Sequence, residues 1–289
     1  MKTKLHLLGL LFALLLASPS FALNATWNAA TDVPATSNGY TASGTVNFTL
    51  NFAPPVGTNL TVVKNTALGF ISGTFSNLAQ GQSVALSFGG STYRFVANYY
   101  GGTGNDLVLI WASNRPVAWG TNGNGQLGNN STTRSLVPIA VNKAGVLAGK
   151  TIIGMGGGYA HSVAVCSDGT LVTWGGNGSG ALGIGSSSVP SLVPVAVNTT
   201  GALAGKTPIA VATGPYYSLV LCSDGSVAAW GSNNGGELGN NSTTESNVPV
   251  AVNTSGVLAG KTVVAIAASN GHNLALCSDG TLVQGLRMK

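Results

Sequence analysis

His161, Ser162 and Asp168 are the three residue types of a nucleophilic hydrolase triad, and they lie within eight positions of one another. In such a triad the serine, the imidazole and the carboxylate form a chain of hydrogen bonds. Seven residues of extended strand would separate His161 from Asp168 by about 23 Å, which is far too great a distance. The spacing argues against this chemistry, and His161 is expected to be a hydrogen-bonded structural residue that opens a strand.

A metal site is a second possibility for the histidines. His161 and His272 stand at equivalent points of a repeat, with Tyr217 at that point of the copy between them. A metal needs several ligands that converge on one point, and these two histidines lie two repeats apart. Glu237 and Glu245 are too isolated to act as an acid and base pair. We therefore predict no catalytic residue, metal or cofactor, and the binding residues stay unknown at this level.

Three copies of Leu-Ala-Gly-Lys-Thr, at 147–151, 203–207 and 258–262, resemble part of a phosphate-binding loop. That loop needs four residues between its two glycines and a helix after it. Here only three residues separate the glycines, as between Gly145 and Gly149, and no helical pattern follows. A nucleotide site is not predicted.

A glycine-rich stretch from Gly101 to Leu109 fits the nonapeptide of calcium-binding β-rolls, with Asp106 as the candidate ligand. Calcium draws about six to eight oxygen ligands from adjacent turns of such a roll. The chain has no second copy of the stretch. The preferred interpretation is a turn before a strand, and calcium binding is the alternative.

Tryptophan and cysteine recur with one period along the chain. The residues are Trp119, Trp174 and Trp230, and Cys166, Cys222 and Cys277. Successive copies lie 55 or 56 residues apart, a period typical of stacked or radially arranged units. Neighbouring cysteines should be one unit apart, beyond the roughly 7 Å limit for a disulfide, and are predicted to be buried free thiols. The tryptophans are predicted to lie in the core, with a recognition surface as the alternative.

Short strands and tight turns make up each copy of the repeat. In the second copy the strand-like pieces are 170–174, 192–197, 209–212 and 217–222. The Asp-Gly pairs are predicted to form two-residue hairpin turns with positive φ at both positions; they stand at 168/169, 224/225 and 279/280. In the loop after each Trp-Gly pair, a leucine should tuck beneath the turn; these are Leu127, Leu182 and Leu238. One strand of each copy contains a proline and should lie at an outer edge, since proline donates no ladder hydrogen bond; the prolines are Pro138, Pro194 and Pro249.

The first 111 residues contain no copy of this repeat. Lys2 and Lys4 precede the apolar run 7–16 and the small residues around Ala22, a pattern typical of a signal peptide cleaved after Ala22. The apolar run is shorter than the roughly 20 residues of a membrane span, so an uncleaved anchor is the weaker alternative. Strand-like pieces then follow at 45–52, 60–63, 83–88, 93–97 and 107–110. We predict a signal peptide over 1–22, a small β-rich domain over 23–111 and repeats over 112–289.

Charge argues against nucleic acid as a partner. Without Lys2 and Lys4 the chain has ten basic and seven acidic residues. Nucleic-acid-binding proteins cluster their Lys and Arg, whereas Lys150, Lys206 and Lys261 simply mark one repeat position.

Four short antiparallel strands per unit, repeated radially, are the architecture of a β-propeller. The stretch 119–128, with 157–169 and Trp174-Gly175 after it, resembles the repeat of the regulator of chromosome condensation family. The resemblance covers about 112–284 and implies an all-β fold of three four-stranded blades, with copies at 114–169, 170–225 and 226–284. Family members usually close seven blades, so three form an incomplete ring whose exposed edges invite pairing. The third copy lacks the Trp-Gly ending and reads Gln284-Gly285 where the chain approaches it, which suggests a natural truncation or a frame error.

The segment before the repeats is similar, over 71–75 and 99–109, to short β-rich segments of exported bacterial surface proteins. The Sec-type signal peptide, the loops on a rigid repeat scaffold and the lack of a convergent cluster of titratable residues lead us to expect a non-catalytic, exported protein-interaction or scaffold module, secreted or located at the cell surface or in the periplasm. Its partner is expected to be another protein or a cell-surface polymer, bound through loops on the propeller faces, with no membrane span after signal cleavage. The alternatives are a regulator like a guanine-nucleotide exchange factor and an inhibitor of a secreted enzyme. An enzyme such as a polysaccharide lyase or hydrolase would need paired carboxylates or a metal.

Overall fold

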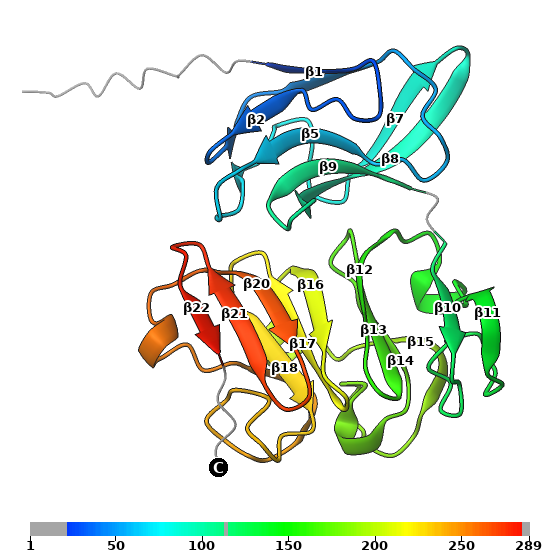
Figure 1. Ribbon diagram of the computed structural model, residues 1–289, viewed down its shortest axis with the longest axis vertical. Helices are drawn as coiled ribbons and strands as arrows, with labels where there is room; N and C mark the ends of the chain where they lie inside the picture. Colours follow the sequence, from blue (N-terminus) through cyan, green and yellow to red (C-terminus); the bar gives the residue numbers. More distant parts are fainter. Residues whose placement is uncertain (1–21, 113–114, 285–289) are drawn as a thin grey trace, which may run out of the picture.

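The computed structural model describes residues 22–112 and 115–284 as two β-rich regions, one above the other in Figure 1. The predicted signal peptide lies outside the described residues except for Ala22. None of the helices in these two described ranges is long and apolar enough to cross a membrane.

The N-terminal region folds as a small β-domain, and its longer predicted strands are present. Its strands are β1 (Leu23–Trp27), β2 (Ala35–Ser37), β3 (Thr41–Ala42), β4 (Val46–Leu50), β5 (Leu60–Asn65), β6 (Ser72–Gly73), β7 (Ser83–Phe88), β8 (Ser91–Gly101) and β9 (Asp106–Trp111). Five of them form one sheet in the order β2-β5-β9-β8-β7, while β1 pairs with β4 and β3 with β6. Alternate apolar side chains of these strands face a common core in which Trp27 and Phe95 are fully buried. The Trp27 indole N–H donates to the oxygen of Thr61, 2.9 Å away, so the polar edge of this core residue is satisfied.

The repeat region contains thirteen strands and four short 3₁₀ turns. The strands are β10 (Val117–Gly120), β11 (Ser135–Ala140), β12 (Ile152–Gly157), β13 (His161–Cys166), β14 (Leu171–Gly175), β15 (Ser191–Ala196), β16 (Pro208–Thr213), β17 (Tyr217–Cys222), β18 (Val227–Gly231), β19 (Ser246–Ala251), β20 (Val263–Ala268), β21 (Asn273–Cys277) and β22 (Leu282–Gln284). The 3₁₀ turns are η1 (Gly145–Leu147), η2 (Gly178–Gly180), η3 (Gly201–Leu203) and η4 (Gly256–Leu258).

These strands form propeller blades arranged in an arc (Figure 1). Two blades are complete, β12-β13-β14-β15 and β16-β17-β18-β19, while β10-β11 is a two-stranded sheet and β20-β21-β22 a three-stranded one. β12 contacts β16, and β16 contacts β20, so the first strand of each blade lies innermost. The all-β partial propeller is confirmed, but each blade takes two strands before an Asp-Gly turn and two after it. The three copies of the sequence are therefore offset from the blades by half a unit.

The Asp-Gly turns differ from the predicted two-residue type. In the first, Gly169 N–H donates to the oxygen of Cys166 at 2.9 Å, and Cys166 N–H to the oxygen of Thr170 at 2.8 Å. Only the glycine has positive φ, +80° at Gly169. This is a three-residue loop whose last residue is left-handed. Asp168 instead accepts a hydrogen bond from the N–H of Thr170 at 3.0 Å, which explains its place in the turn without a strained backbone.

The edge and loop predictions are confirmed. The proline-containing strands β11, β15 and β19 are each the last strand of their sheet. The three loop leucines are buried, as are the asparagines that precede them, Asn122, Asn177 and Asn233. In each loop the asparagine side-chain oxygen accepts the leucine N–H, at 2.9, 3.1 and 2.8 Å along the chain. The asparagine thus supplies the buried polar partner that the turn needs.

The N-terminal domain docks on one end of the blades, at their Cys-Ser-Asp-Gly turns. The Gln80 amide donates to the oxygen of Ser167 at 3.3 Å, and the Tyr100 hydroxyl hydrogen-bonds to Ser223. Gly69 lies against Ser278. Three successive blades therefore present the same serine to the N-terminal domain, which leaves their opposite ends uncovered by it.

Candidate interaction site

The uncovered end of the blades displays a pair of tyrosines. Tyr159 lies between β12 and β13, Tyr216 between β16 and β17, and their side chains are 74% and 46% exposed. Their ring centroids are 5.6 Å apart with the planes tilted by 50°. Exposed aromatic side chains that are held in place are typical anchors of protein interfaces.

Main-chain hydrogen bonds hold these two loops together. The N–H of Tyr159 donates to the oxygen of Pro215 at 2.9 Å, which joins the second blade to the third. The N–H of Ser232 donates to the oxygen of Tyr216, also at 2.9 Å, and fixes the second loop to the strand end beside it. The tyrosine pair therefore lies on a pre-organised backbone, which lowers the entropy cost of binding.

His161 is buried two residues after Tyr159, at the start of β13. Its Nε2 lies 2.8 Å from the Ser218 hydroxyl on the next blade, while Nδ1 has no partner among the described residues. Burial lowers the pKa of His161 to about 4, so the ring is neutral at pH 7. Tyr217, at the same repeat position, donates to the oxygen of Ser269 at 2.8 Å on the following blade. Both residues join neighbouring blades, as the structural interpretation of His161 predicts.

A groove of about 360 Å³ runs beside Tyr159. The residues that line it include Trp119, Gln126, His161 and Ser162. Trp119 is 62% exposed. The prediction that all three repeat tryptophans lie in the core is therefore wrong for Trp119, because no blade precedes β10 among the described residues to cover it. Trp174 and Trp230 are buried as predicted.

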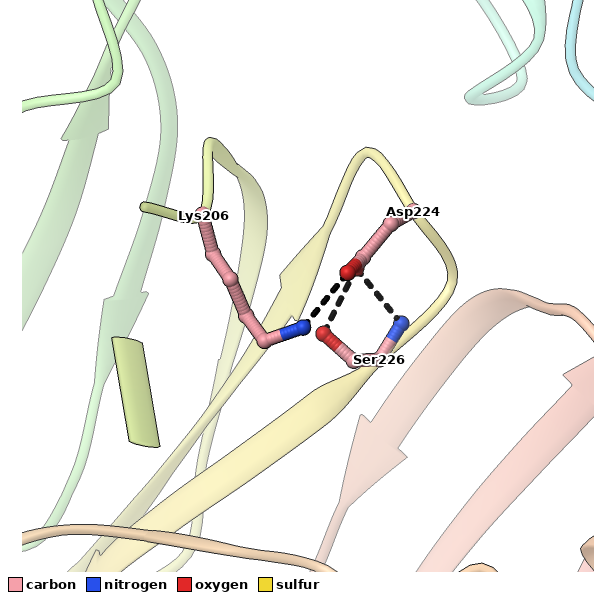
Figure 2. A network of polar contacts seen from close by, with 3 residues as sticks. All are labelled: Lys206, Asp224 and Ser226. Carbon is pink, nitrogen blue, oxygen red and sulfur yellow. Dashed lines mark hydrogen bonds and ion pairs between the residues drawn. The ribbon is translucent and has the colours of Figure 1, made fainter. Parts of the chain in front are cut away.

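On the opposite end of the blades, each repeat lysine pairs with the aspartate of its turn. Lys206 Nζ lies 2.5 Å from Asp224, whose carboxylate also accepts from the N–H and hydroxyl of Ser226 (Figure 2). Lys150 with Asp168 and Lys261 with Asp279 repeat this arrangement. The lysine and the Ser226 hydrogen bonds lower the pKa of Asp224 to about 2 against the opposing effect of its burial. The pairs fix the turns and present no free carboxylate for catalysis.

The other residues that the sequence singled out are engaged locally. Asp106 accepts the N–H of Asn65 at 2.8 Å, as expected of a turn residue beside a strand. No group of three or more histidine, cysteine or acidic residues that could hold a metal occurs in the part of the chain that the structure describes. All three cysteines are buried and free, as predicted, and burial raises the pKa of Cys166 to about 11. Ser162 donates to the oxygen of Gln126 at 2.9 Å, so its hydroxyl proton is not directed at His161.

Sequence analysis did not single out Tyr159 and Tyr216. They are offset by one position when the copies are superposed, because Tyr216 aligns with Ala160 and Tyr159 with Pro215. A search for residues that depart from the repeat in its loops would have found both.

Comparison with known proteins places this geometry in a family. The family model "Regulator of chromosome condensation (RCC1) repeat" matches residues 118–165, 168–221 and 224–276. The human protein "Probable E3 ubiquitin-protein ligase HERC6" is 31% identical over 175 residues, which cover 60% of this chain and 16% of that protein. "Ultraviolet-B receptor UVR8" of Arabidopsis thaliana is 33% identical over 165 residues, covering 57% of this chain and 35% of the receptor.

Two solved structures share the fold. The crystal structure of human WBSCR16 aligns with a TM-score of 0.53 at 23% identity, over 71% of this chain and 48% of that one. Yeast RCC1 (Prp20), solved with Kap60 bound, aligns with a TM-score of 0.50 at 22% identity, over 61% of this chain and 41% of that one. The chain thus spans less than half of the length of each of these four relatives. Because the three family matches together cover more than half of its residues, the protein belongs to the regulator of chromosome condensation (RCC1) repeat family.

Proposed function

We propose that this protein is a non-catalytic, exported interaction module that holds another protein against the loop face of its propeller arc. The observation that carries the proposal is the exposed Tyr159–Tyr216 pair. A tyrosine offers apolar area and a hydroxyl at low entropy cost, which suits it to bind a protein surface. A cell-surface polymer is the second candidate ligand, since sugar rings also pack on exposed aromatic faces.

The acidic residues of the repeats support a role without catalysis. The three turn aspartates are each paired with a lysine, and Glu237 accepts the N–H of Gly235 at 2.8 Å. Acid and base catalysis needs carboxylates that converge on one substrate. Here these carboxylates serve the local backbone instead.

The binding proposal is tested by affinity capture from the secreted fraction of the source cells. The mature chain is used as bait beside the double variant Tyr159→Ser/Tyr216→Ser. The control is Phe88→Ser, which changes a partly exposed aromatic on the N-terminal domain. We expect the unchanged chain and Phe88→Ser to retain the same partner and the double variant to lose it. Equal capture by all three chains, or capture of nothing by any, would refute the assignment of this face.

Export rests on the predicted signal peptide and needs its own test. The full chain is expressed with its own N-terminus in a bacterial host, and the secreted or periplasmic product is analysed by N-terminal sequencing. A mature protein that begins at Leu23 is the expected result. Retention of the intact chain in the cytosol would remove export from the proposal and would favour an intracellular regulator such as an exchange factor.

A further inference from the structure

The two ends of the propeller arc are complementary fragments of a blade. β10 and β11 occupy the positions that β14 and β15 hold in the complete blade, because all four strands carry the same part of the repeat. β20, β21 and β22 occupy the first three positions, and the fourth is vacant in the described chain. One end therefore has the third and fourth strands without the first two, and the other end has the first two with only a short third.

Within the arc, tryptophan is the residue that locks each blade to the one before it. Trp174 lies against Gly128 and donates its indole N–H to the oxygen of Gln126 at 2.9 Å. Trp230 repeats this contact one blade later, against Gly183, with its N–H donated to the oxygen of Ala181 at 2.9 Å. A methyl group at either glycine would lie 2.7 Å from the indole nitrogen, so the indole fits only because the residue is glycine. We call the glycine together with the carbonyl oxygen that accepts the indole N–H the tryptophan slot.

The third such slot is open in the part of the chain that the structure describes. Gly239 is the repeat equivalent of Gly128 and Gly183, and a methyl group there would meet only Val252, at 3.3 Å. A cavity of about 250 Å³ lies at this point, and its predominantly apolar walls include Leu238, Gly239 and Val252. The sequence has glycine, Gly285, where the two other copies have tryptophan.

The slot also has a hydrogen-bond acceptor in place. The oxygen of Glu237 is equivalent to those of Gln126 and Ala181, which accept the indole N–H in the other blades. Here it accepts the side-chain amide of Asn273 at 2.6 Å. An entering indole can share this acceptor with Asn273, as Trp174 and Ser162 share the oxygen of Gln126.

At the other end of the arc, Trp119 is the one repeat tryptophan without a slot. It stands on β10 at the position that Trp174 holds on β14, and it is 62% exposed. Among the described residues, the arc thus has one unfilled slot and one uncovered tryptophan, at its opposite ends.

A second pair of positions is complementary in the same way. Leu192 on β15 packs over Gly125, and Asn247 on β19 packs over Gly180. Their equivalent on β11, Leu136, is 84% exposed, and the equivalent glycine, Gly236, has open space around it.

A main-chain hydrogen bond accompanies each of these contacts. The oxygen of Leu192 accepts the N–H of Asn130, and that of Asn247 accepts the N–H of Gly185, both at 2.9 Å. Asn241 holds the repeat position of Asn130 and Gly185. Its N–H is therefore the donor that would serve the oxygen of Leu136.

We propose that the chain associates head to tail with a second copy of itself, whose β10 and β11 complete the blade begun by β20 and β21. Trp119 of one copy enters the slot at Gly239 of the other, and Leu136 covers Gly236. β10 replaces β22 along β21 in the register of the complete blades, where Trp174 lies opposite Ser162 and Trp230 opposite Ser218. Asn273 holds that position on β21, so Trp119 lies opposite Asn273 and Val117 opposite Ala275.

Displacement of β22 is compatible with its few contacts. It contains three residues, and Leu282 is 65% exposed although its equivalents Leu171 and Val227 are buried. The incoming β11 would be the outer strand of the completed blade. It contains Pro138, and proline is tolerated at such an edge because it donates no ladder hydrogen bond. The outer strands β15 and β19 contain Pro194 and Pro249 at the same position. Since the surfaces that meet are different on the two copies, the contact is heterologous and gives a closed ring or an open chain of copies.

Sedimentation velocity of the mature chain across a concentration series tests the proposal. We expect oligomers that form with increasing concentration. The variant Trp119→Ala/Leu136→Ser should stay monomeric, and it should fold because both side chains are exposed. The control Leu68→Ser/Val56→Ser removes two exposed apolar side chains from the N-terminal domain and should associate like the unchanged chain. A monomer at every concentration, or equal association of both double variants, would overturn the proposal.

A cysteine cross-link tests the register. Val117→Cys in one chain and Ala275→Cys in another should form an intermolecular disulfide on mild oxidation, since directly opposite strand residues come within bridging distance. Val117→Cys mixed with Leu276→Cys is shifted by one residue and should cross-link much less. Equal yields from the two mixtures would refute the strand pairing.

The identity of the occupant is tested with N-acetyl-tryptophanamide as a soluble indole. We expect it to compete with Trp119 and to shift the oligomers toward monomer. If the compound binds a chain that is monomeric throughout, the slot is a receptor for a foreign tryptophan, and self-association is refuted.

Discussion

The indole nitrogen of Trp230 lies 2.9 Å from the main-chain oxygen of Ala181, to which it donates its proton. This contact joins the third strand of one blade to the loop of the blade before it. Each blade is too thin to bury its own apolar face, so the stability of the arc depends on such contacts between neighbours.

The first prediction concerns this tryptophan. Trp230→Ala should lower the free energy of unfolding by about 3 to 5 kcal/mol, because it empties a fully buried site and leaves the Ala181 oxygen without its donor. Trp119→Ala is the matched control and should cost less than about 0.5 kcal/mol when measured on dilute, separate chains. Urea unfolding followed by circular dichroism measures both. Similar losses for the two variants would contradict the role given to the slot.

The second prediction is a loss of stability in mild acid that originates at His161. The ring is neutral in the fold with a pKa of about 4, whereas in the unfolded chain it takes up a proton near pH 6.5. Between these values the unfolded state binds more protons, so the free energy of unfolding falls as the pH is lowered from about 6.5 to about 4. The loss should be about 3 kcal/mol.

The control for this pH dependence is His161→Gln, which removes the titrating ring. Its stability should vary much less over that interval than that of the unchanged chain. If the free energy of unfolding of His161→Gln fell with pH as steeply as that of the unchanged chain, the prediction would be wrong.

The third prediction compares how much the ion pair and the turn hydrogen bonds of Asp224 each contribute to stability. Lys206→Gln should cost less than about 1 kcal/mol, since the two side chains are 32% and 50% exposed and water screens the pair. Asp224→Ala should cost more, because the N–H of Ser226 also loses its acceptor. Asp224→Asn keeps that acceptor and should fall between the two. Thermal unfolding ranks the three variants, and a larger loss for Lys206→Gln than for Asp224→Ala would contradict this assignment.

The fold lowers the pKa of Asp224, as it lowers that of His161, so this turn also loses stability as the pH falls. The pKa of Asp224 lies at about 2 in the fold and at about 3.9 in a free chain. Its contribution is complete above the unfolded value and is lost as the pH falls from there to about 2. This window lies below that of His161, so a pH titration of stability should resolve the two.

The fourth prediction concerns the three cysteines. They are buried, and burial raises the pKa of Cys166 to about 11. A thiol reagent such as Ellman's reagent needs the thiolate and access to it. The native protein should therefore react with almost none of its cysteines and the protein in denaturant with all three. Rapid reaction of a native thiol would show that the blade interior opens.

The fifth prediction concerns the contact between the N-terminal domain and the blades. Tyr100 packs edge-on against Phe70, with ring centroids 5.3 Å apart, and hydrogen-bonds to Ser223. Tyr100→Ala removes both contacts and should separate one calorimetric transition into two. Tyr93→Ala, which changes an aromatic on the same strand β8 that packs against Trp111 within the domain, should lower stability without separating the transitions. A single unchanged transition in Tyr100→Ala would show that the regions are coupled elsewhere.

Much of this structure was predictable from the sequence, because each copy of the repeat contains the same local pattern of strand and turn residues. The period of the tryptophans and cysteines, the proline strands and the buried loop leucines all reflect strand alternation and turn geometry within some fifty residues. These patterns determined the all-β fold, the propeller architecture and the free thiols. The same patterns explain why His161 is structural, since its spacing from Asp168 excludes a triad in any extended strand.

Only the tertiary structure decided which copy of each residue is covered. Trp119 and Trp230 have the same place in the repeat, yet one is exposed and the other buried, because burial depends on the blade that precedes them in space. For the same reason a repeated glycine is the floor of a filled slot at Gly183 and of an open one at Gly239. The Tyr159–Tyr216 pair likewise exists only where two loops from different blades meet. Local pattern determines the shape of a unit, but the contacts at its faces come from neighbours that the pattern of one copy does not contain.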